Sequence, residues 1–350
     1  MGRRSLLLLV AGIVVLVAAT LAVVDRLHAE KPVPAPPVSQ PGANPRVWPK
    51  ALIVPSERSF KLDLIEKLDK APEVIFFGGS RSSRLEGSYV QKKTGLTGFN
   101  LAFTNGKPED AWALAHYLHD RWPKTRLRWI WGIQPWTFGD RPMDGALIQD
   151  PRLNKYFPDA LLRAQGELLP QTPDKVPKHR PGYNWRYAAD GTRIWDYYDR
   201  KYAEGLTLDE VIAKAIAPLP GKPAKSPAPV TAGTPFPTTR ARTYFEKTLA
   251  YLNSIGVTPI LVGMPMQPTI LQARIDAGSQ RSYARFLGYV DSLHKSYDVE
   301  FIDLLHIESV GGQPNGFYDG VHLRFANARL LIDKLAASYP EQFAKQPGDE

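Results

Sequence analysis

Short apolar runs alternate with amphipathic stretches from about residue 56 onward. The apolar runs have the length of buried strands, and they lie at 73–77, 99–103, 127–133, 258–263 and 299–302. The stretches between them place apolar residues at helical spacing and predict helices at 57–70, 82–94, 108–121, 239–254, 283–297 and 326–338. This alternation predicts an α/β fold, a three-layer α/β/α sandwich around a parallel sheet of about five strands. In such sheets, ligands bind at the carboxyl ends of the strands.

Residues 140–238 interrupt this alternation between the third and fourth predicted strands. They contain an aromatic-rich stretch at 183–202, a short helix predicted at 208–217 and a segment rich in Pro and Ala at 218–238. We interpret them as an insertion. It either forms a cap over a site at the carboxyl edge of the sheet or is a surface subdomain without a part in function.

A run of 19 residues without charge occupies 6–24, and Arg3 and Arg4 precede it. As a helix it would just span a hydrocarbon core of about 30 Å. The two arginines favour a cytoplasmic N-terminus, residues 1–5. The alternative is a cleaved signal peptide, whose apolar region is normally only about 7–15 residues long and ends in a small-x-small site. We therefore predict a retained single-pass anchor.

A proline-rich segment, residues 25–55, separates this run from the globular part. Prolines favour an extended and semi-rigid chain. We therefore predict a stalk that holds an extracytoplasmic domain, residues 56–340, off the cell membrane. Residues 341–350 are predicted to be a flexible tail.

Composition narrows the class of protein. The 350 residues are 43% apolar and 23% charged, which fits a folded domain and not a disordered chain. The absence of cysteine excludes disulfides, thiolate metal sites, iron–sulfur clusters and cysteine nucleophiles. A net charge of +9 either favours anionic partners or belongs to an unspecific basic surface. No zinc-finger, helix-turn-helix or RNA-binding pattern points to nucleic acid as a partner.

Ser80 follows the first predicted strand and two glycines, and the helix predicted at 82–94 comes next. This is the arrangement of an activated nucleophile, because glycines allow a tight turn and the N–H groups at a helix N-terminus can hold an oxyanion. Two alternatives remain at this point. Ser80 is either a helix-capping residue, or the Gly-Gly-Ser turn binds a phosphate.

Asp319 and His322 lie three residues apart just before the last predicted helix. At this spacing in a turn, both side chains can point the same way. A histidine then serves as a general base, while the carboxylate fixes its tautomer and stabilises the imidazolium. The alternative is a surface turn with a chance histidine. Two further loops, at 104–106 and 132–136, end the second and third predicted strands and are candidates to supply oxyanion donors.

Taken together, these features resemble the SGNH/GDSL hydrolase superfamily. Four blocks occur in that family's order, namely GGSRSS (78–83), FNLAFTNGKPEDA (99–111), IWGIQPW (130–136) and the D-x-x-H that ends at His322. With the predicted anchor, they look most like its extracytoplasmic branch. That branch includes D-alanyl transfer proteins of teichoic acid modification and alginate O-acetylation proteins.

The resemblance implies a role for each matching residue. Ser80 would be the nucleophile, His322 the general base and Asp319 its orienting carboxylate. The backbone N–H groups of Ser80 and Gly106 would form two arms of an oxyanion hole.

Two positions depart from the family's pattern. Gly79 stands where the family usually has an aspartate that is not catalytic, and Gln134 stands nearest to the usual third-block asparagine. Gln134 can donate the same hydrogen bond, although its side chain is one methylene longer. Losing one such donor typically costs about 10²–10³ in rate.

Arg81, Arg84, Asn105 and Trp136 are candidates for binding substrate. The two arginines either hold an anionic substrate, such as an acidic polysaccharide or a phosphate polymer, or are solvated helix residues. Aromatic side chains near the candidate site either stack on sugar rings or pack in the core, and these are Trp136, Trp185, Trp195 and Tyr198.

From the resemblance we expect a membrane-anchored serine esterase or O-acyltransferase. It would act on acyl esters, most simply acetyl esters, of a cell-envelope or exported polysaccharide through an acyl-serine intermediate. The chemistry needs neither a metal nor an organic cofactor, and a membrane-embedded partner protein would supply the acyl donor. The alternative from another class is an inactive protein of the same fold that binds glycans or serves as a scaffold in envelope polymer assembly.

Overall fold

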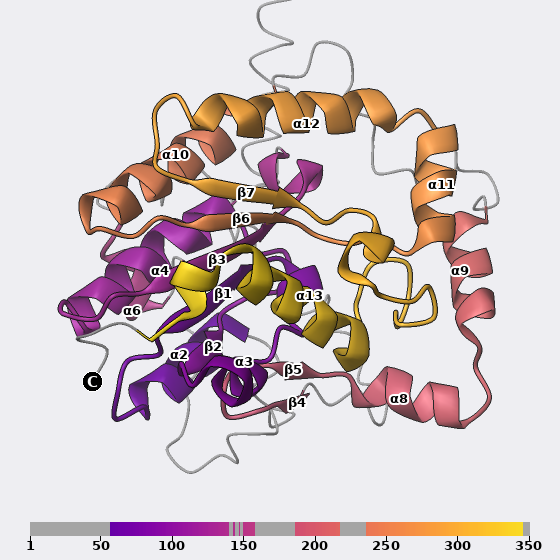
Figure 1. Ribbon diagram of the computed structural model, residues 1–350, viewed down its shortest axis with the longest axis horizontal. Helices are drawn as coiled ribbons and strands as arrows, with labels where there is room; N and C mark the ends of the chain where they lie inside the picture. The colour runs from indigo at the N-terminus through magenta and orange to yellow at the C-terminus, as the bar shows by residue number, and fades with distance from the viewer. Residues whose placement is uncertain are drawn as a thin grey trace, which may run out of the picture. The chain divides into compact units, whose positions relative to one another are not determined.

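A five-stranded parallel sheet forms the centre of the fold (Figure 1). The computed structural model describes residues 57–139, 143, 147, 150–157, 186–217 and 236–345. The strands of the sheet are β1 (Val74–Gly78), β2 (Gly98–Asn100), β3 (Arg128–Ile133), β6 (Ile260–Gly263) and β7 (Glu300–Asp303). They lie in the order β2-β1-β3-β6-β7, and every neighbouring pair is parallel. The parallel sheet predicted from the apolar runs is therefore confirmed.

Helices cover both faces of this sheet. In β1, Ile75 and Phe77 point into one apolar cluster, whereas Val74 and Phe76 point into a second cluster on the opposite face. The first cluster is completed by α2 (Glu57–Glu66), α4 (Pro108–Arg121), α10 (Thr239–Ser254) and α12 (Gln280–Leu293). The second is completed by α3 (Gly87–Thr94) and α13 (Phe325–Ser338). This two-sided covering is consistent with the predicted three-layer sandwich.

Most predicted helices are present, with differences at their ends. The stretches predicted at 108–121 and 239–254 coincide with α4 and α10. The helix predicted at 82–94 was wrong in its first half, because the chain makes only a one-turn 3-10 helix at Ser80–Ser82 before α3 begins at Gly87. One further helix, α11 (Pro268–Asp276), was not predicted, although it begins with proline in its first turn.

The C-terminal prediction needs a correction. Residues 341–350 were expected to form a flexible tail, but Pro340–Phe343 forms a short helix, α14. Phe343 is buried in the apolar cluster that includes residues of α13, because moving a large apolar side chain out of water is favourable. The folded part therefore extends at least through this residue.

The described part of the insertion contains the short helix α6 (Pro151–Asn154) and, further along, four more elements. They are a two-stranded hairpin, β4 (Arg186–Tyr187) and β5 (Arg193–Ile194), followed by α8 (Asp196–Ala203) and α9 (Leu208–Ile216). Figure 1 shows α8, α9 and α11 gathered at the end of the sheet to which the strand arrows point. The insertion therefore contributes to the carboxyl edge of the sheet, where a site was expected.

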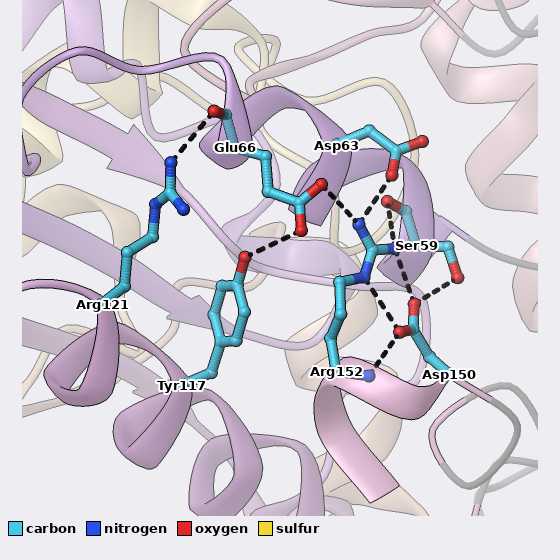
Figure 2. A network of polar contacts seen from close by, with 7 residues as sticks. All are labelled: Ser59, Asp63, Glu66, Tyr117, Arg121, Asp150 and Arg152. Carbon is cyan, nitrogen blue, oxygen red and sulfur yellow. Dashed lines mark hydrogen bonds and ion pairs between the residues drawn. The ribbon is translucent and has the colours of Figure 1, made fainter. Parts of the chain in front are cut away.

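An ionic network ties α2 to α4 and to the first described part of the insertion (Figure 2). Arg152 in α6 (Pro151–Asn154) contacts Asp63 at 2.7 Å, Glu66 at 3.1 Å and Asp150 at 2.7 Å. Glu66 also accepts a hydrogen bond from the hydroxyl of Tyr117 on α4. Because one guanidinium bridges three carboxylates, the network holds α2 in a fixed position against its neighbours.

No helix among the described residues is long and apolar enough to cross a membrane. The predicted anchor at 6–24 and the predicted stalk at 25–55 lie outside the described residues, as does Trp185.

Candidate active site

The candidate nucleophile lies at the point of the sheet where the strand order reverses. The chain runs from β1 outward to β2 and then returns to the other side of β1 as β3. The helices that follow β1 and β2 therefore leave in opposite directions. Such a switch point opens a crevice at the carboxyl ends of the strands. Ser80 follows β1 and Gln134 follows β3, so both residues lie beside this point.

Gly78 makes the sharp turn that presents Ser80. Its φ of 138° is one that residues with a Cβ rarely adopt. A Cβ at this position would also lie 2.5 Å from the carbonyl oxygen of Gly132 and 2.7 Å from Oγ of Ser82. The sequence therefore needs glycine here, and the turn leads directly into the one-turn helix that begins at Ser80.

The second half of the site is a tight turn before α13. Phe317 and Leu323 pair across it as an antiparallel bridge, and the N–H of Tyr318 donates to the carbonyl oxygen of His322. Inside the turn, Oδ1 of Asp319 accepts from the backbone N–H groups of residues 321 and 322 at 2.8 and 2.9 Å. The carboxylate is therefore fixed by its own turn before it meets the imidazole.

Ser80, His322 and Asp319 form a continuous chain of hydrogen bonds. Ser80 Oγ lies 2.8 Å from His322 Nε2, and His322 Nδ1 lies 2.8 Å from Asp319 Oδ2. The fold therefore brings together the side chains of Ser80 and His322, which are 242 positions apart in the sequence. The side chains of His322 and Asp319 are 16% and 18% exposed, so the group is sheltered but still open to solvent.

The charge of Asp319 sets the tautomer of His322. Burial raises the pKa of the Asp319 carboxyl, but His322 and the hydrogen bonds from His322 and Val321 outweigh burial and lower this pKa below its ordinary value. A carboxylate only accepts hydrogen bonds, so Nδ1 of the imidazole carries the proton. Nε2 is then free to accept the proton of the Ser80 hydroxyl, which is the arrangement that a general base requires.

Two of the three predicted oxyanion donors are available. Among the described residues, the Ser80 N–H and the Gln134 side-chain NH₂ have no hydrogen-bond acceptor. The Gln134 Nε2 would lie 3.3 Å from a Cβ built at Gly79, so it faces the turn that carries Ser80. The Gln134 amide is therefore close enough to the Ser80 turn to serve as the third-block donor that the sequence predicts.

The third predicted donor needs a correction. The Gly106 N–H already donates to the carbonyl oxygen of Phe103 at 3.1 Å, so it is not a free oxyanion donor in this structure. Gly106 has a different part to play in the site. A Cβ there would lie 2.2 Å from the carbonyl oxygen of Gly78, so only glycine lets this loop lie against the end of β1.

Arg81 orients the Gln134 amide. Its Nη1 donates to Gln134 Oε1 at 2.9 Å, and its Nη2 donates to the carbonyl oxygens of Met264 and Pro265. Because a guanidinium has no acceptor, the oxygen of the amide must face Arg81 and the NH₂ group must face away from it. Arg81, the residue after the candidate nucleophile, thus fixes the orientation of the Gln134 amide.

The alternative that Arg81 and Arg84 are solvated helix residues was wrong, whereas their contact with substrate stays a prediction. Arg81 is 3% exposed, and the chain-end carbonyls of β6 occupy its donors. Arg84 is 1% exposed and lies 4.4 Å from the ring centroid of Tyr318 and 4.3 Å from that of Phe325. Burial lowers the pKa of both arginines. Both guanidinium groups therefore pack inside the fold.

An aromatic wall from the insertion covers one face of the imidazole. The ring of Trp195 lies 4.3 Å from that of His322, and it stacks on Tyr198 and Tyr318 at 5.3 and 5.8 Å. For the part of the insertion that carries Trp195 and Tyr198, these contacts favour the interpretation as a cap over the site. The sequence could not reveal the contact, because Trp195 and His322 are brought together only by the fold.

The two remaining substrate-binding candidates occupy different settings. Trp136 is half-buried between the guanidinium groups of Arg81 and Arg274, at 5.1 and 5.0 Å from its ring centroid. Asn105 is exposed and has a φ of 56°, a conformation that asparagine tolerates better than most residues. Among the described residues, no group of three or more His, Asp or Glu side chains is placed to hold a metal ion.

Replacing Gln134 by methionine tests its place as a donor. Methionine keeps the length and volume of the side chain but cannot donate, so we expect kcat to fall by about 10²–10³ with little change in KM. Ester turnover by wild type and variant is the measurement. A Gln134→Met enzyme with unchanged kcat would remove the side chain from the oxyanion hole.

Neither a family model nor a curated protein matches this chain. The resemblance to SGNH/GDSL hydrolases therefore stays a prediction from the motifs.

Proposed function

We propose that this protein is a serine acyl-transfer enzyme. The observation that carries the proposal is the unbroken line from Ser80 Oγ through the His322 imidazole to the Asp319 carboxylate, with both distances at 2.8 Å. A hydroxyl, a base and an orienting carboxylate at these distances are what nucleophilic catalysis at an ester requires.

In the first step, the Ser80 hydroxyl attacks the carbonyl carbon of an ester, and His322 Nε2 takes the hydroxyl proton. The Ser80 N–H and the Gln134 amide hold the negative oxygen of the tetrahedral intermediate. The intermediate collapses when His322 returns the proton to the departing alcohol, which leaves an acyl group on Ser80.

In the second step, His322 takes a proton from an incoming hydroxyl, which attacks the acyl-serine. Water as acceptor gives an esterase, and a sugar hydroxyl gives an O-acyltransferase. The second tetrahedral intermediate collapses when His322 returns this proton to Ser80 Oγ, so that Ser80 is regenerated and the acyl group leaves on the acceptor. His322 carries each proton that is transferred. No residue changes its oxidation state.

The substrate class follows from the sequence-based expectations. A predicted anchor at 6–24 and a predicted stalk would place the site outside the cytoplasm, where esters of envelope or exported polysaccharides are the natural targets. The aromatic wall formed by Trp195 and Tyr198 supports this choice, because flat rings beside the nucleophile suit the apolar faces of sugars. A membrane-embedded partner would deliver the acyl donor.

The experiment that tests the proposal separates the two acceptors. The purified protein is given p-nitrophenyl acetate with and without an excess of an acetylatable oligosaccharide, and both p-nitrophenol release and sugar acetylation are followed. Transfer to sugar with matching loss of hydrolysis supports the transferase, and hydrolysis alone supports the esterase. Alkaline release of acetate from envelope glycans of wild-type and Ser80→Ala cells identifies the biological direction. If no acyl group ever reaches Ser80 by mass spectrometry, the proposal fails.

A further inference from the structure

A buried lysine outside the triad contacts the loop 101–106, which lies beside Ser80. Lys61 lies on α2 and is 0% exposed. Its Nζ donates to the carbonyl oxygen of Ala102 at 2.6 Å and to Oδ1 of Asn100 at 3.2 Å. The acyl-transfer steps described above make no use of this cation, although burying it is costly.

A carboxylate one turn earlier on the same helix holds the other end of that loop. Oε2 of Glu57 accepts a hydrogen bond from the backbone N–H of Thr104 at 2.6 Å. The spacing of four residues places Glu57 and Lys61 on one face of α2, next to each other. The helix α2 thus holds the loop at two points: the Lys61 ammonium binds the carbonyl of Ala102, and the Glu57 carboxylate binds the N–H of Thr104.

The gripped loop lies directly against the turn that carries Ser80. The N–H of Phe103 donates to the carbonyl oxygen of Gly78 at 3.1 Å, and Gly106 lies against the same carbonyl. Asn100 completes the link, because its Nδ2 donates at 2.8 Å to the carbonyl oxygens of both Ser82 and Leu85. A shift of the loop would therefore move the segment that sets the position of the Ser80 N–H.

Further contacts make α2 and the loop rigid. Arg58 on α2 forms a buried ion pair with Asp110 at 2.6 Å, in addition to the Arg152 network of Figure 2. From the other side, Nη1 of Arg193 on β5 donates to Oγ1 of Thr104 at 3.0 Å. Because these contacts fix α2, the hydrogen bonds from Lys61 and Glu57 hold the loop in one position.

We propose that Lys61 and Glu57 form a clamp that positions the loop 101–106, and through it the Ser80 turn, for acyl transfer. The two residues are positioning residues and touch no substrate. This inference rests on the proposed function, since it assigns the clamp to the same reaction.

The charges around Lys61 make the clamp sensitive to pH. Burial lowers the pKa of Lys61 to about 7, Glu57 and Asp190 oppose this shift, and Arg193 adds to it. The rings of Phe103 and Tyr187 complete the surroundings of the ammonium group. A charged donor makes a hydrogen bond about twice as strong as a neutral one. The hold on the Ala102 carbonyl therefore weakens as pH rises through about 7.

The test compares Lys61→Met, Glu57→Gln and the control Lys67→Met, which removes an exposed lysine just after α2. Active sites are counted by fluorophosphonate labelling, and kcat and KM for p-nitrophenyl acetate are measured from pH 5.5 to 9. We expect Lys61→Met to lower kcat per labelled site by about 10- to 100-fold, the size of effect that a small misplacement causes. KM should change little. Glu57→Gln should act in the same direction, and Lys67→Met should match wild type.

The ratio of wild-type to Lys61→Met kcat isolates the lysine, because titrations common to both proteins cancel. We expect this ratio to fall as pH rises through about 7. A merely structural lysine would lower the number of labelled sites but leave kcat per site and its pH profile unchanged, and that result would overturn the clamp. Should Lys61→Met fail to fold, Glu57→Gln decides by the same kcat per site. Wild type that is neither labelled nor active would instead refute the proposed function, and the clamp with it.

Discussion

Ser80→Ala is expected to abolish labelling by a fluorophosphonate probe and to reduce ester turnover by at least about 10⁴-fold. Alanine removes the only hydroxyl within 2.8 Å of His322 Nε2 among the described residues, so no acyl-enzyme can form there. In other enzymes with a serine triad, loss of the nucleophile lowers kcat by up to about 10⁶-fold, and the residual rate comes from the oxyanion donors and substrate binding. The variant should fold like wild type, because it removes one half-buried oxygen atom from a turn.

Two measurements make this result specific to Ser80. Ser88→Ala changes an exposed serine on α3 and should label and turn over at the wild-type rate. Mass spectrometry of the labelled wild type should place the probe on the peptide that contains Ser80. If Ser80→Ala is labelled as fast as Ser88→Ala, another residue is the nucleophile and the proposed mechanism is wrong.

The fold could be predicted because its signals are local. The three central strands, β1, β3 and β6, are largely apolar runs buried on both faces, and such runs are visible in the sequence without knowing their partners. The ends of α4 and α10 were predicted correctly because proline and paired acids begin the former, and glycine two residues beyond the latter helps to stop it. In contrast, the sequence did not reveal that the chain makes only a one-turn 3-10 helix at Ser80–Ser82 before α3 begins at Gly87.

In the candidate site too, local contacts could be predicted and long-range contacts could not. Asp319 and His322 could be paired from the sequence, because three residues in one turn bring them together whatever the rest of the chain does. The burial of Arg81 could not be predicted, since its acceptors come from Gln134, 53 positions away, and from the end of β6. Lys61 gave no signal either. A lysine in an amphipathic helix is normally exposed, and only the loop at Ala102 explains its burial.

The contacts that tie Ser80 to distant segments have a common consequence. Three segments that are distant in the sequence contact residues 78–81, because Gln134 bonds Arg81, the loop 101–106 bonds Gly78 and His322 bonds the Ser80 hydroxyl. A site built in this way is rigid before substrate arrives, which favours a preorganised oxyanion hole over an induced one.

Asp319→Asn should lower kcat by about 10⁴-fold while leaving the shape of the site intact. The amide oxygen can still accept from the backbone N–H groups of residues 321 and 322, so the turn should keep its form. The NH₂ group then faces Nδ1 of His322, which must become an acceptor. The proton moves to Nε2, and the imidazole can no longer take the proton of Ser80.

The matched control is Asp333→Asn, an aspartate on α13 that pairs with Lys93 and contacts Tyr89 away from the triad. It should keep wild-type kcat. Stability offers a second readout, because the pKa of Asp319 is lowered in the folded protein from its ordinary 3.8. The folded state therefore binds a proton less readily than the unfolded state. The stabilisation by the carboxylate is present above about pH 4 and is lost as pH falls through the lowered pKa. Asparagine has no such titration, so urea unfolding should show the stability gap between wild type and Asp319→Asn closing as the solution becomes acidic. An Asp319→Asn enzyme with full kcat would mean that the carboxylate only shapes the turn, and the assignment of His322 as an oriented base would have to be withdrawn.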